Sequence, residues 1–240
     1  MIFQSLLTER IIIVGIGQVW PIIYLSIFAY KLLKRAKNRS TITISSLFLM
    51  IATAYSFAIF SILSINSPFS FVFYITSWYF LMFSHSFFIL FIWLLLHIEE
   101  SMSFIKYYIF LLMYGGIVSY VFWIGIFCNG IQYDMSTGWR PVFSLPFAII
   151  NWTYIIFILV IPEIIMAIKL LKIFKGVKIV IRIKLFLISS FLEYVVMILL
   201  ILYNTLPDNH VYRSIHIFIN LPLGMLAAYF IYRSIGKKIE

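Results

Sequence analysis

The sequence predicts an all-α integral membrane protein, a bundle of seven transmembrane helices in one domain that spans residues 1–240. Three observations predict it: the composition, the lengths of the apolar runs and the placement of the cations. Of 240 residues, 64% are hydrophobic and only 11% are charged, whereas a soluble domain is about half apolar and about a quarter charged. Such a chain has too few polar side chains to cover its apolar surface in water, so its place is a lipid bilayer.

The apolar runs have the length of membrane-spanning helices. A hydrocarbon core about 30 Å thick needs roughly 20 apolar residues per helix, and the long unbroken runs lack the alternation of barrel strands. The first run is too long for a signal-peptide core and has no A-x-A cleavage site, which predicts a retained helix. Short loops make neighbouring helices antiparallel. The seven predicted helices are 11–30, 42–66, 70–96, 105–128, 147–168, 185–204 and 211–232.

Lysine and arginine predict the orientation. Short cytoplasmic loops of membrane proteins carry an excess of lysine and arginine. Only three of the cations of this chain, Arg10, Arg140 and Arg213, lie on one side of the predicted bundle. The N-terminus is therefore predicted to be outside and the C-terminus in the cytoplasm, in a multi-pass protein of the cell membrane. The cations of the other side are Lys31, Lys34, Arg35, Lys37, Arg39, Lys106, Lys169, Lys172, Lys175, Lys178, Arg182, Lys184, Arg233, Lys237 and Lys238.

The basic stretch 169–184 has two interpretations. One is a docking surface for a cytoplasmic signalling protein. The other is a set of anchors in anionic headgroups, where each cation contributes about 1 kcal/mol. The net charge of +10 does not indicate nucleic-acid binding, because the cations follow the loops rather than one accessible face.

Two carboxyls, Glu163 and Glu193, lie inside the predicted spans. A charge at mid-membrane costs about 3 kcal/mol on insertion scales, so such residues face the bundle interior and mark functional sites by default. Ser189 and Ser190 share a helical face with Glu193, and Asn204 continues it, which predicts an inward polar seam. For Glu163, pairing with Lys169 or extension to the interface is the alternative to a functional role.

Further polar residues in the spans complete a candidate ligand-binding set with Glu193 and Glu163: His85, His216, Asn220 and Gln18. His85 lies centrally in the third run, and His216, Asn220 and Gly224 recur every four residues in the seventh. The alternatives are a hydrogen-bonded core histidine at His85 and close helix packing at Asn220 and Gly224.

The longest predicted outer loop, 129–146, carries Asp134, Trp139 and Arg140. Its Gly, Asn, Asp and Pro residues favour turns. A hairpin lid over the mouth of the bundle and an ordinary connector are both open interpretations of this loop.

The short loops, small residues and aromatic residues of the seven predicted helices are similar to those of the seven-helix sensor modules at the N-terminus of some histidine kinases. This resemblance covers the whole bundle and rests on topology. It implies a signalling role after the last helix and assigns no site residue.

The sequence thus favours a sensor or receptor-like protein that binds a small or lipophilic ligand in a polar pocket between its helices. Pro21, Pro162 and Pro222 each remove one backbone hydrogen bond and are predicted hinges. The rival hypothesis is a proton-coupled small-molecule transporter, in which Glu163, Glu193 and His85 pass protons.

Several other classes are disfavoured. The seventh run, 211–232, contains no lysine, which excludes covalently bound retinal. No two histidines lie at ligand spacing on one helix, so no metal site is predicted. The single Cys128 forms no internal disulfide. An enzyme acting on lipid ranks last, because no nucleophile, base and orienting group fall at one depth. No cofactor is expected.

Overall fold

The computed structural model describes residues 2–65, 67–97 and 103–236, with side chains from residue 17 onward except those of 210, 217 and 236. All seven predicted runs are helical, and two of them are interrupted. Lys237, Lys238 and the side chain of Arg10 lie outside the described part of the chain. The helical elements are α1 (Ile2–Arg35), α2 (Arg39–Leu63), α3 (Phe69–Ser84), α4 (Ser86–Leu96), α5 (Phe104–Phe127), α6 (Leu145–Thr153), the π-helix η1 (Tyr154–Val160), α7 (Ile161–Ile173), α8 (Val177–Thr205) and α9 (His210–Gly236).

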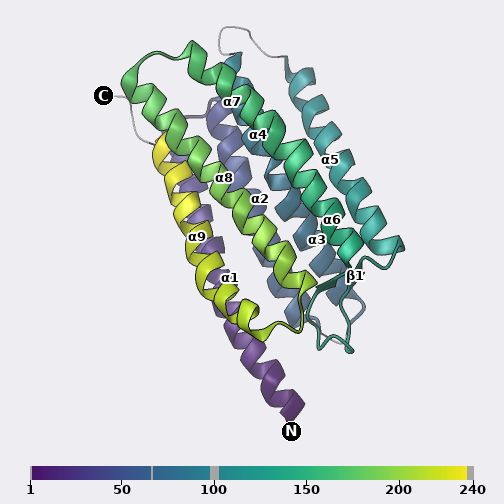
Figure 1. The fold of residues 1–240 in the computed structure, drawn as a ribbon. Helices are drawn as coiled ribbons and strands as arrows, with labels where there is room; N and C mark the ends of the chain where they lie inside the picture. Colours follow the sequence, from purple (N-terminus) through teal and green to yellow (C-terminus); the bar gives the residue numbers. More distant parts are fainter. Residues whose placement is uncertain (1, 66, 98–102, 237–240) are drawn as a thin grey trace.

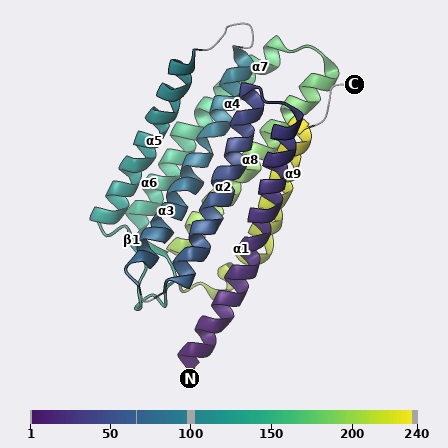
Figure 2. The same ribbon diagram turned by 180° about the vertical axis from the view of Figure 1, so that it is seen from behind.

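The helices form an elongated bundle with two layers (Figure 1). One layer holds α1, α2 and the α3–α4 pair, and the other holds α9, α8 and the continuous α6–η1–α7 unit; α5 closes one edge (Figure 2). At the opposite edge α1 packs on α9, where Phe28 and Tyr232 stack with ring centroids 4.7 Å apart. The layers meet where α4 packs on α7. Polar residues on these inner faces are therefore brought together from distant parts of the sequence.

Side-chain caps fix where several helices begin. Asn38 accepts a hydrogen bond from the backbone N–H of Thr41 at the start of α2. Ser103 caps α5 through Lys106, and Ser144 caps α6 through Phe147. Each cap satisfies a backbone donor that the first helical turn leaves free.

The third predicted helix is broken at His85, between α3 and α4. The sequence around the break, Ser84-His85-Ser86, turns three successive side chains back onto the preceding turn. Ser84 donates to Leu81 O at 2.6 Å, Ser86 to Phe83 O at 2.7 Å, and His85 Nδ1 lies 2.8 Å from Leu81 O. Side chains that bond to backbone carbonyls in this way compete with the helical ladder and bend it.

The fifth predicted helix contains a π-helical segment, η1, directly before Pro162. Proline has no N–H, so the carbonyl of Ile158, four residues earlier, loses its helical donor. The hydroxyl of Tyr114 on α5 donates to that carbonyl at 3.3 Å. The irregular backbone is thus satisfied by a neighbouring helix, as buried polar groups within a membrane require.

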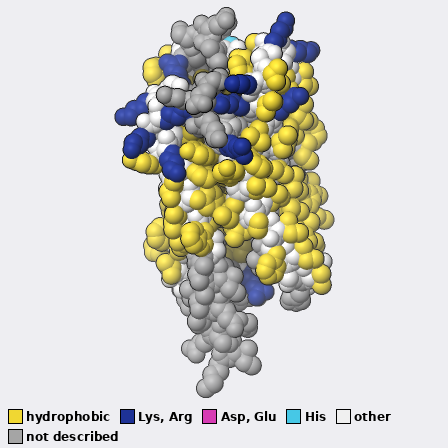
Figure 3. All heavy atoms as spheres, turned by 90° about the vertical axis from the view of Figure 1, so that its left-hand side faces the viewer, with side chains coloured by type: hydrophobic (Ala, Val, Ile, Leu, Met, Phe, Trp, Pro, Cys, Tyr) yellow, Lys and Arg dark blue, Asp and Glu magenta, His cyan; other side chains and the backbone are white. Residues whose placement is uncertain are grey.

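The outer surface matches a lipid environment. Within the described residues, six helical segments are long and apolar enough to cross a membrane, and α1, with 34 residues, is a further long helix. Large apolar side chains such as Leu112, Phe157 and Phe218 are more than half exposed. Figure 3 shows hydrophobic side chains over the middle of one face, with Lys and Arg side chains gathered mainly toward one end. The chain therefore has the surface of a multi-pass membrane protein.

The loop between α5 and α6 forms a small antiparallel hairpin. Strands β1 (Ile131–Gln132) and β2 (Val142–Phe143) pair with Ile131 opposite Phe143 and Gln132 opposite Val142. Tyr133 is buried against Tyr74 of α3, with ring centroids 4.8 Å apart. Of the loop 129–146, which the sequence leaves open as a hairpin lid or a connector, the segment 131–143 forms a hairpin that packs on one end of the bundle.

Glycine permits the close approach of α6 to the end of α5. A Cβ on Gly125 would lie 2.5 Å from the ring of Phe147, which is itself 1% exposed and packed on Phe143. We expect Gly125→Ala to lower the free energy of unfolding by about 1–3 kcal/mol, because the ring has little room to move. Gly116→Ala on the same helix is the matched control, since a Cβ there meets nothing within 4 Å. Equal stabilities of the two variants in a denaturant titration would contradict this packing.

Candidate buried polar site

Glu163 is the centre of a buried polar cluster between α7 and α8. Its side chain is 0% exposed. The hydroxyl of Ser190 donates to Oε1, and the hydroxyl of Tyr194 donates to Oε2. The predicted alternative for Glu163, a pair with Lys169, is not formed, because Lys169 is exposed on the same helix. Both carboxyl oxygens are instead held by a neighbouring helix.

Local sequence explains why these groups meet. Glu163 lies in the first turn of α7, directly after η1 and Pro162. Ser190 and Tyr194 are four residues apart on α8, and residues at this spacing lie on the same helical face. One face of α8 therefore offers two hydroxyl donors to a single carboxyl group.

His85 joins this cluster from the break between α3 and α4. Its ring centroid lies 5.7 Å from that of Tyr194 and 5.8 Å from that of Phe88. The Leu81 carbonyl only accepts, so His85 carries its proton on Nδ1, and Nε2 is left as an acceptor. Nε2 is buried and has no hydrogen-bond partner. We call His85, Glu163, Ser190 and Tyr194 the Glu163 cluster.

Glu193 lies on a different face of α8 from the Glu163 cluster. It is 8% exposed and close enough to Tyr24 of α1 and Tyr55 of α2 to interact electrostatically with both. Adjacent residues on a helix point about 100° apart, so Glu193 and Tyr194 face different neighbours. Within the described side chains, no hydrogen bond to the Glu193 carboxyl is formed. The structure thus places the His85 ring against Tyr194, which in turn bonds to Glu163; among the described side chains, no hydrogen bond joins His85 to Glu193.

The predicted inward seam on α8 is buried throughout. Ser189 and Ser190 are 0% exposed and Asn204 is 3% exposed. Ser189 donates to Leu185 O within its own helix, at 2.5 Å. Ser190 alone among these three bonds to a carboxyl group. Helical periodicity predicted that the seam is buried. It did not predict that Ser190 bonds to Glu163 of α7 and not to Glu193 of its own helix.

The remaining predicted ligand-binding residues lie apart from the Glu163 cluster. His216 is buried and stacks on Tyr203, with ring centroids 4.6 Å apart. Asn220 Oδ1 and Gln18 Oε1 are buried acceptors without a partner. Among the described side chains, no hydrogen bond or ring contact links these three residues to the Glu163 cluster. They do not form one pocket with it.

The outer-loop residues Asp134, Trp139 and Arg140 shape the hairpin. Asp134 Oδ1 accepts from the backbone N–H and the hydroxyl of Ser136, and these bonds, led by that of the hydroxyl, hold the pKa of Asp134 below its usual value. Trp139 has a positive φ of 58° and packs edge-on against Tyr133. Arg140 is exposed. These contacts form the turn of the hairpin. Both interpretations of the loop, a lid and an ordinary connector, are compatible with this geometry.

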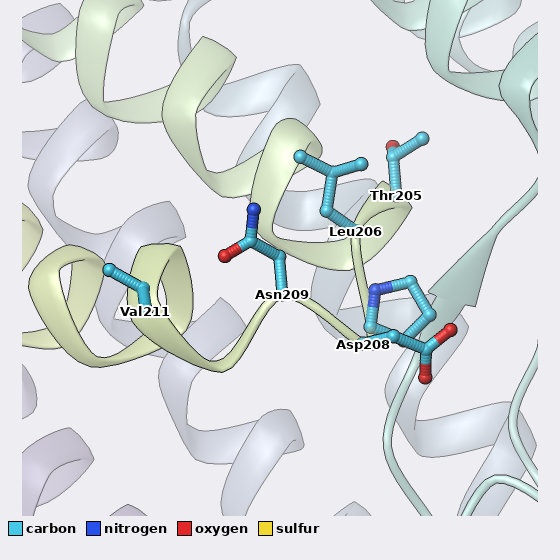
Figure 4. Close-up of a pocket in the computed structure, with 6 residues that line it drawn as sticks. Thr205, Leu206, Asp208, Asn209 and Val211 are labelled. Carbon is cyan, nitrogen blue, oxygen red and sulfur yellow. The ribbon is translucent and has the colours of Figure 1, made fainter.

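A shallow hollow lies at the turn between α8 and α9. Its volume is about 660 Å³, and it is lined by Thr205, Leu206, Pro207, Asp208, Asn209 and Val211. Figure 4 shows the side chains of Thr205, Leu206 and Asn209 around the turn, with Asp208 to one side. The hollow is open to the surroundings, and none of the residues that line it belongs to the Glu163 cluster.

Sequence reasoning missed three tyrosines that complete the interior. Tyr194 holds Glu163, Tyr114 satisfies the carbonyl before Pro162, and Tyr203 packs against His216. The only sequence signal for Tyr194 is its spacing of four residues from Ser190. Tyrosine is common at membrane interfaces, so its presence in a run does not indicate an interior role.

The cluster does not have the composition of a metal centre. Among the residues that the structure describes, no three His, Cys, Asp or Glu side chains gather to hold a metal ion. Comparisons with protein-family models, curated proteins and solved structures gave no match. The arrangement of this chain's own residues therefore carries the functional argument.

Proposed function

We propose that this chain is a seven-helix sensor or receptor-like membrane protein. It binds a small or lipophilic ligand at the Glu163 cluster and signals to a cytoplasmic partner through residues 169–184. One observation carries the proposal: His85 Nε2 is a buried acceptor without a partner, beside a Tyr194–Glu163 hydrogen bond. A ligand that donates a hydrogen bond to Nε2 would remove the cost of this unpaired group, which is about 1–3 kcal/mol.

The cluster lies where the backbone is already irregular. His85 is the residue at which α3 and α4 separate, and Glu163 directly follows η1 and Pro162. Phe88 packs edge-on against Tyr194, and Phe186 packs against Phe88. Ligand entry then displaces an aromatic ring or shifts a helix. π segments and proline sites are places where such shifts occur at low cost.

The movement has a direct route to the basic end of the bundle. Helix α7 runs from the cluster to Ile173, a length of about 15 Å at 1.5 Å per residue, and leads into the basic stretch 169–184. A ligand changes the population of two arrangements only if it binds one of them more tightly. The Glu163 cluster offers such a difference in affinity. A ligand that replaces the Tyr194 hydroxyl on Glu163 removes one of the bonds between α7 and α8, so it binds more tightly to the arrangement in which this bond is already broken.

Native mass spectrometry of the full chain in a mild detergent tests ligand binding. We expect a small-molecule or lipid adduct that is lost in His85→Ala and Glu163→Gln. Glu193→Gln is the matched control, because Glu193 is a second buried carboxyl on a different face of α8. An adduct that survives in both cluster variants, or that only Glu193→Gln removes, would contradict the assignment of the site.

A spin-label distance measurement tests the signalling half of the proposal. In a Cys128→Ser background, labels at Lys169→Cys and Lys184→Cys report the separation of α7 and α8, since both positions are exposed. We expect the distance distribution to differ between the wild-type chain and Tyr194→Phe, because Tyr194→Phe removes one of the two hydrogen bonds from α8 to Glu163 on α7. Identical distributions would argue against a relay through α7.

The rival function is proton-coupled transport, which one observation favours. Glu163 of α7 and Glu193 of α8 are both buried carboxyls, as would suit a proton relay. Liposomes that contain the purified chain discriminate between the two: a carrier acidifies the lumen or moves substrate under a proton gradient, and Glu163→Gln abolishes the flux. A receptor produces no flux in either form.

A further inference from the structure

A second polar cluster lies where α9 begins, at the end of the bundle opposite the basic loops (Figures 1 and 3). Its members are Arg213 and His216 of α9 and Tyr203 of α8. The guanidinium Cζ of Arg213 lies 4.1 Å from the centroid of the Tyr203 ring, and Arg213 Nη2 donates to the Tyr203 hydroxyl at 2.8 Å. The His216 ring stacks on the same tyrosine. We call these three residues the Arg213 cluster.

The cluster has two buried nitrogen atoms without partners. Arg213 is 8% exposed and His216 is 7% exposed, and both Arg213 Nη1 and His216 Nδ1 lack a hydrogen bond. No carboxylate pairs with Arg213 among the described side chains; Asp208, in the preceding turn, is exposed. A buried guanidinium without an anion is costly. The unpaired donor indicates that a further hydrogen-bond partner would complete the cluster.

The position of the cluster indicates the chemistry of the missing group. Arg213 lies three residues after the start of α9 at His210, or about 5 Å along the axis, which is the depth of the headgroups if α9 spans the bilayer. The positive end of the α9 dipole is at the same place and favours an anion. The planar guanidinium binds phosphate with two parallel bonds, and His216 supplies a further donor when its proton is on Nδ1.

We propose that Arg213 and His216, held against Tyr203, bind a phosphate group. The group belongs either to a phospholipid headgroup or to a soluble phosphate compound. The hollow of Figure 4 is a separate feature, because neither Arg213 nor His216 lines it. This site is also separate from the Glu163 cluster, so each proposal can fail without the other.

Native mass spectrometry of the full chain in an uncharged detergent tests the proposal with three probes: phosphatidylglycerol, an uncharged glycosyl diacylglycerol and inorganic phosphate. We expect phosphatidylglycerol to bind more tightly than the glycolipid, and Arg213→Gln to weaken it by about 10- to 100-fold, the usual worth of a hydrogen bond to a charged group. Arg140→Gln, which removes an exposed arginine at the same end, should leave the affinity unchanged.

Two more variants keep the test informative if Arg213→Gln folds poorly. Tyr203→Phe removes the 2.8 Å bond that orients the guanidinium but keeps the ring, and His216→Gln removes the second donor; each should weaken binding by about tenfold. Binding of phosphatidylglycerol that inorganic phosphate does not displace would assign the site to lipid, and displacement would assign it to soluble phosphate. Equal binding of the glycolipid, or equal losses in Arg213→Gln and Arg140→Gln, would overturn the proposal.

Discussion

Replacement of Glu163 by alanine should lower the free energy of unfolding by about 3–5 kcal/mol. Two effects add. Loss of the carboxyl leaves the Tyr194 hydroxyl as a buried donor without a partner, at about 1–3 kcal/mol, and the smaller side chain leaves a cavity that cannot fully collapse. Ser190 loses less, because its hydroxyl already has a second acceptor, Leu187 O, at 2.9 Å.

A double-mutant cycle separates the hydrogen bond from the cavity. Glu163→Ala removes the acceptor and creates the cavity, and Tyr194→Phe removes only the hydroxyl, so the cost of the cavity cancels from the coupling between the two changes. We expect a coupling of about 1 kcal/mol between them, within the range measured for hydrogen bonds between membrane helices. Unfolding is followed by helical circular dichroism during titration with a denaturing detergent. A coupling near zero would mean that the Tyr194–Glu163 bond does not hold α7 to α8.

The stability result also constrains the proposed function. If the bond between Tyr194 and Glu163 is worth about 1 kcal/mol, a ligand that competes for Glu163 has a small cost to overcome. The two arrangements then lie close enough for modest binding energy to change their populations. His85 Nε2, as the unpaired acceptor beside the bond, is the atom at which a donor on the ligand gains most.

The helices were predictable because a bilayer imposes a length on every span, and each of the seven runs meets it. The ends were less predictable. Helix α8 begins at Val177, before the predicted start at 185, because lysine and arginine, here Lys178, Arg182 and Lys184, are good helix formers and continue the helix. A helix predicted from an unbroken apolar run stops at the first lysine, whereas the backbone hydrogen bonds of the real helix continue through the lysine residues.

The interior pairings were not predictable from one sequence. Periodicity places Ser190 and Glu193 on the buried side of α8, but the rotation of α8 relative to α7 and α1 decides that Ser190 bonds to Glu163 and that Glu193 lies near Tyr24. The η1 segment has no compositional signal in its apolar sequence beyond the proline that follows it. The break at His85 shows only in the Ser-His-Ser triplet, whose bonding to backbone carbonyls depends on side-chain rotamers.

The single cysteine should report the orientation of the bundle. Cys128 caps the end of α5 and is exposed, at the hairpin end, away from the basic loops. If the cations hold the 31–39 and 169–184 loops in the cytoplasm, Cys128 faces outward. We expect a membrane-impermeant maleimide to label Cys128 in intact cells and to leave Cys128→Ser unlabelled.

A matched variant distinguishes orientation from leakage of the reagent. In the Cys128→Ser background, Lys175→Cys places an exposed thiol in the turn between α7 and α8, and it should react only after lysis. Moving this loop outward would carry six cations across the bilayer, each at about 2.5–3.5 kcal/mol at the centre of a span, so the expected difference is all or none. If Lys175→Cys is labelled in intact cells, and Cys128 of the wild-type chain is not, the orientation of the bundle is the reverse of the predicted one. It would place the Arg213 cluster in the cytoplasmic leaflet, where anionic lipids are abundant, and would direct any signal through residues 169–184 to the outside.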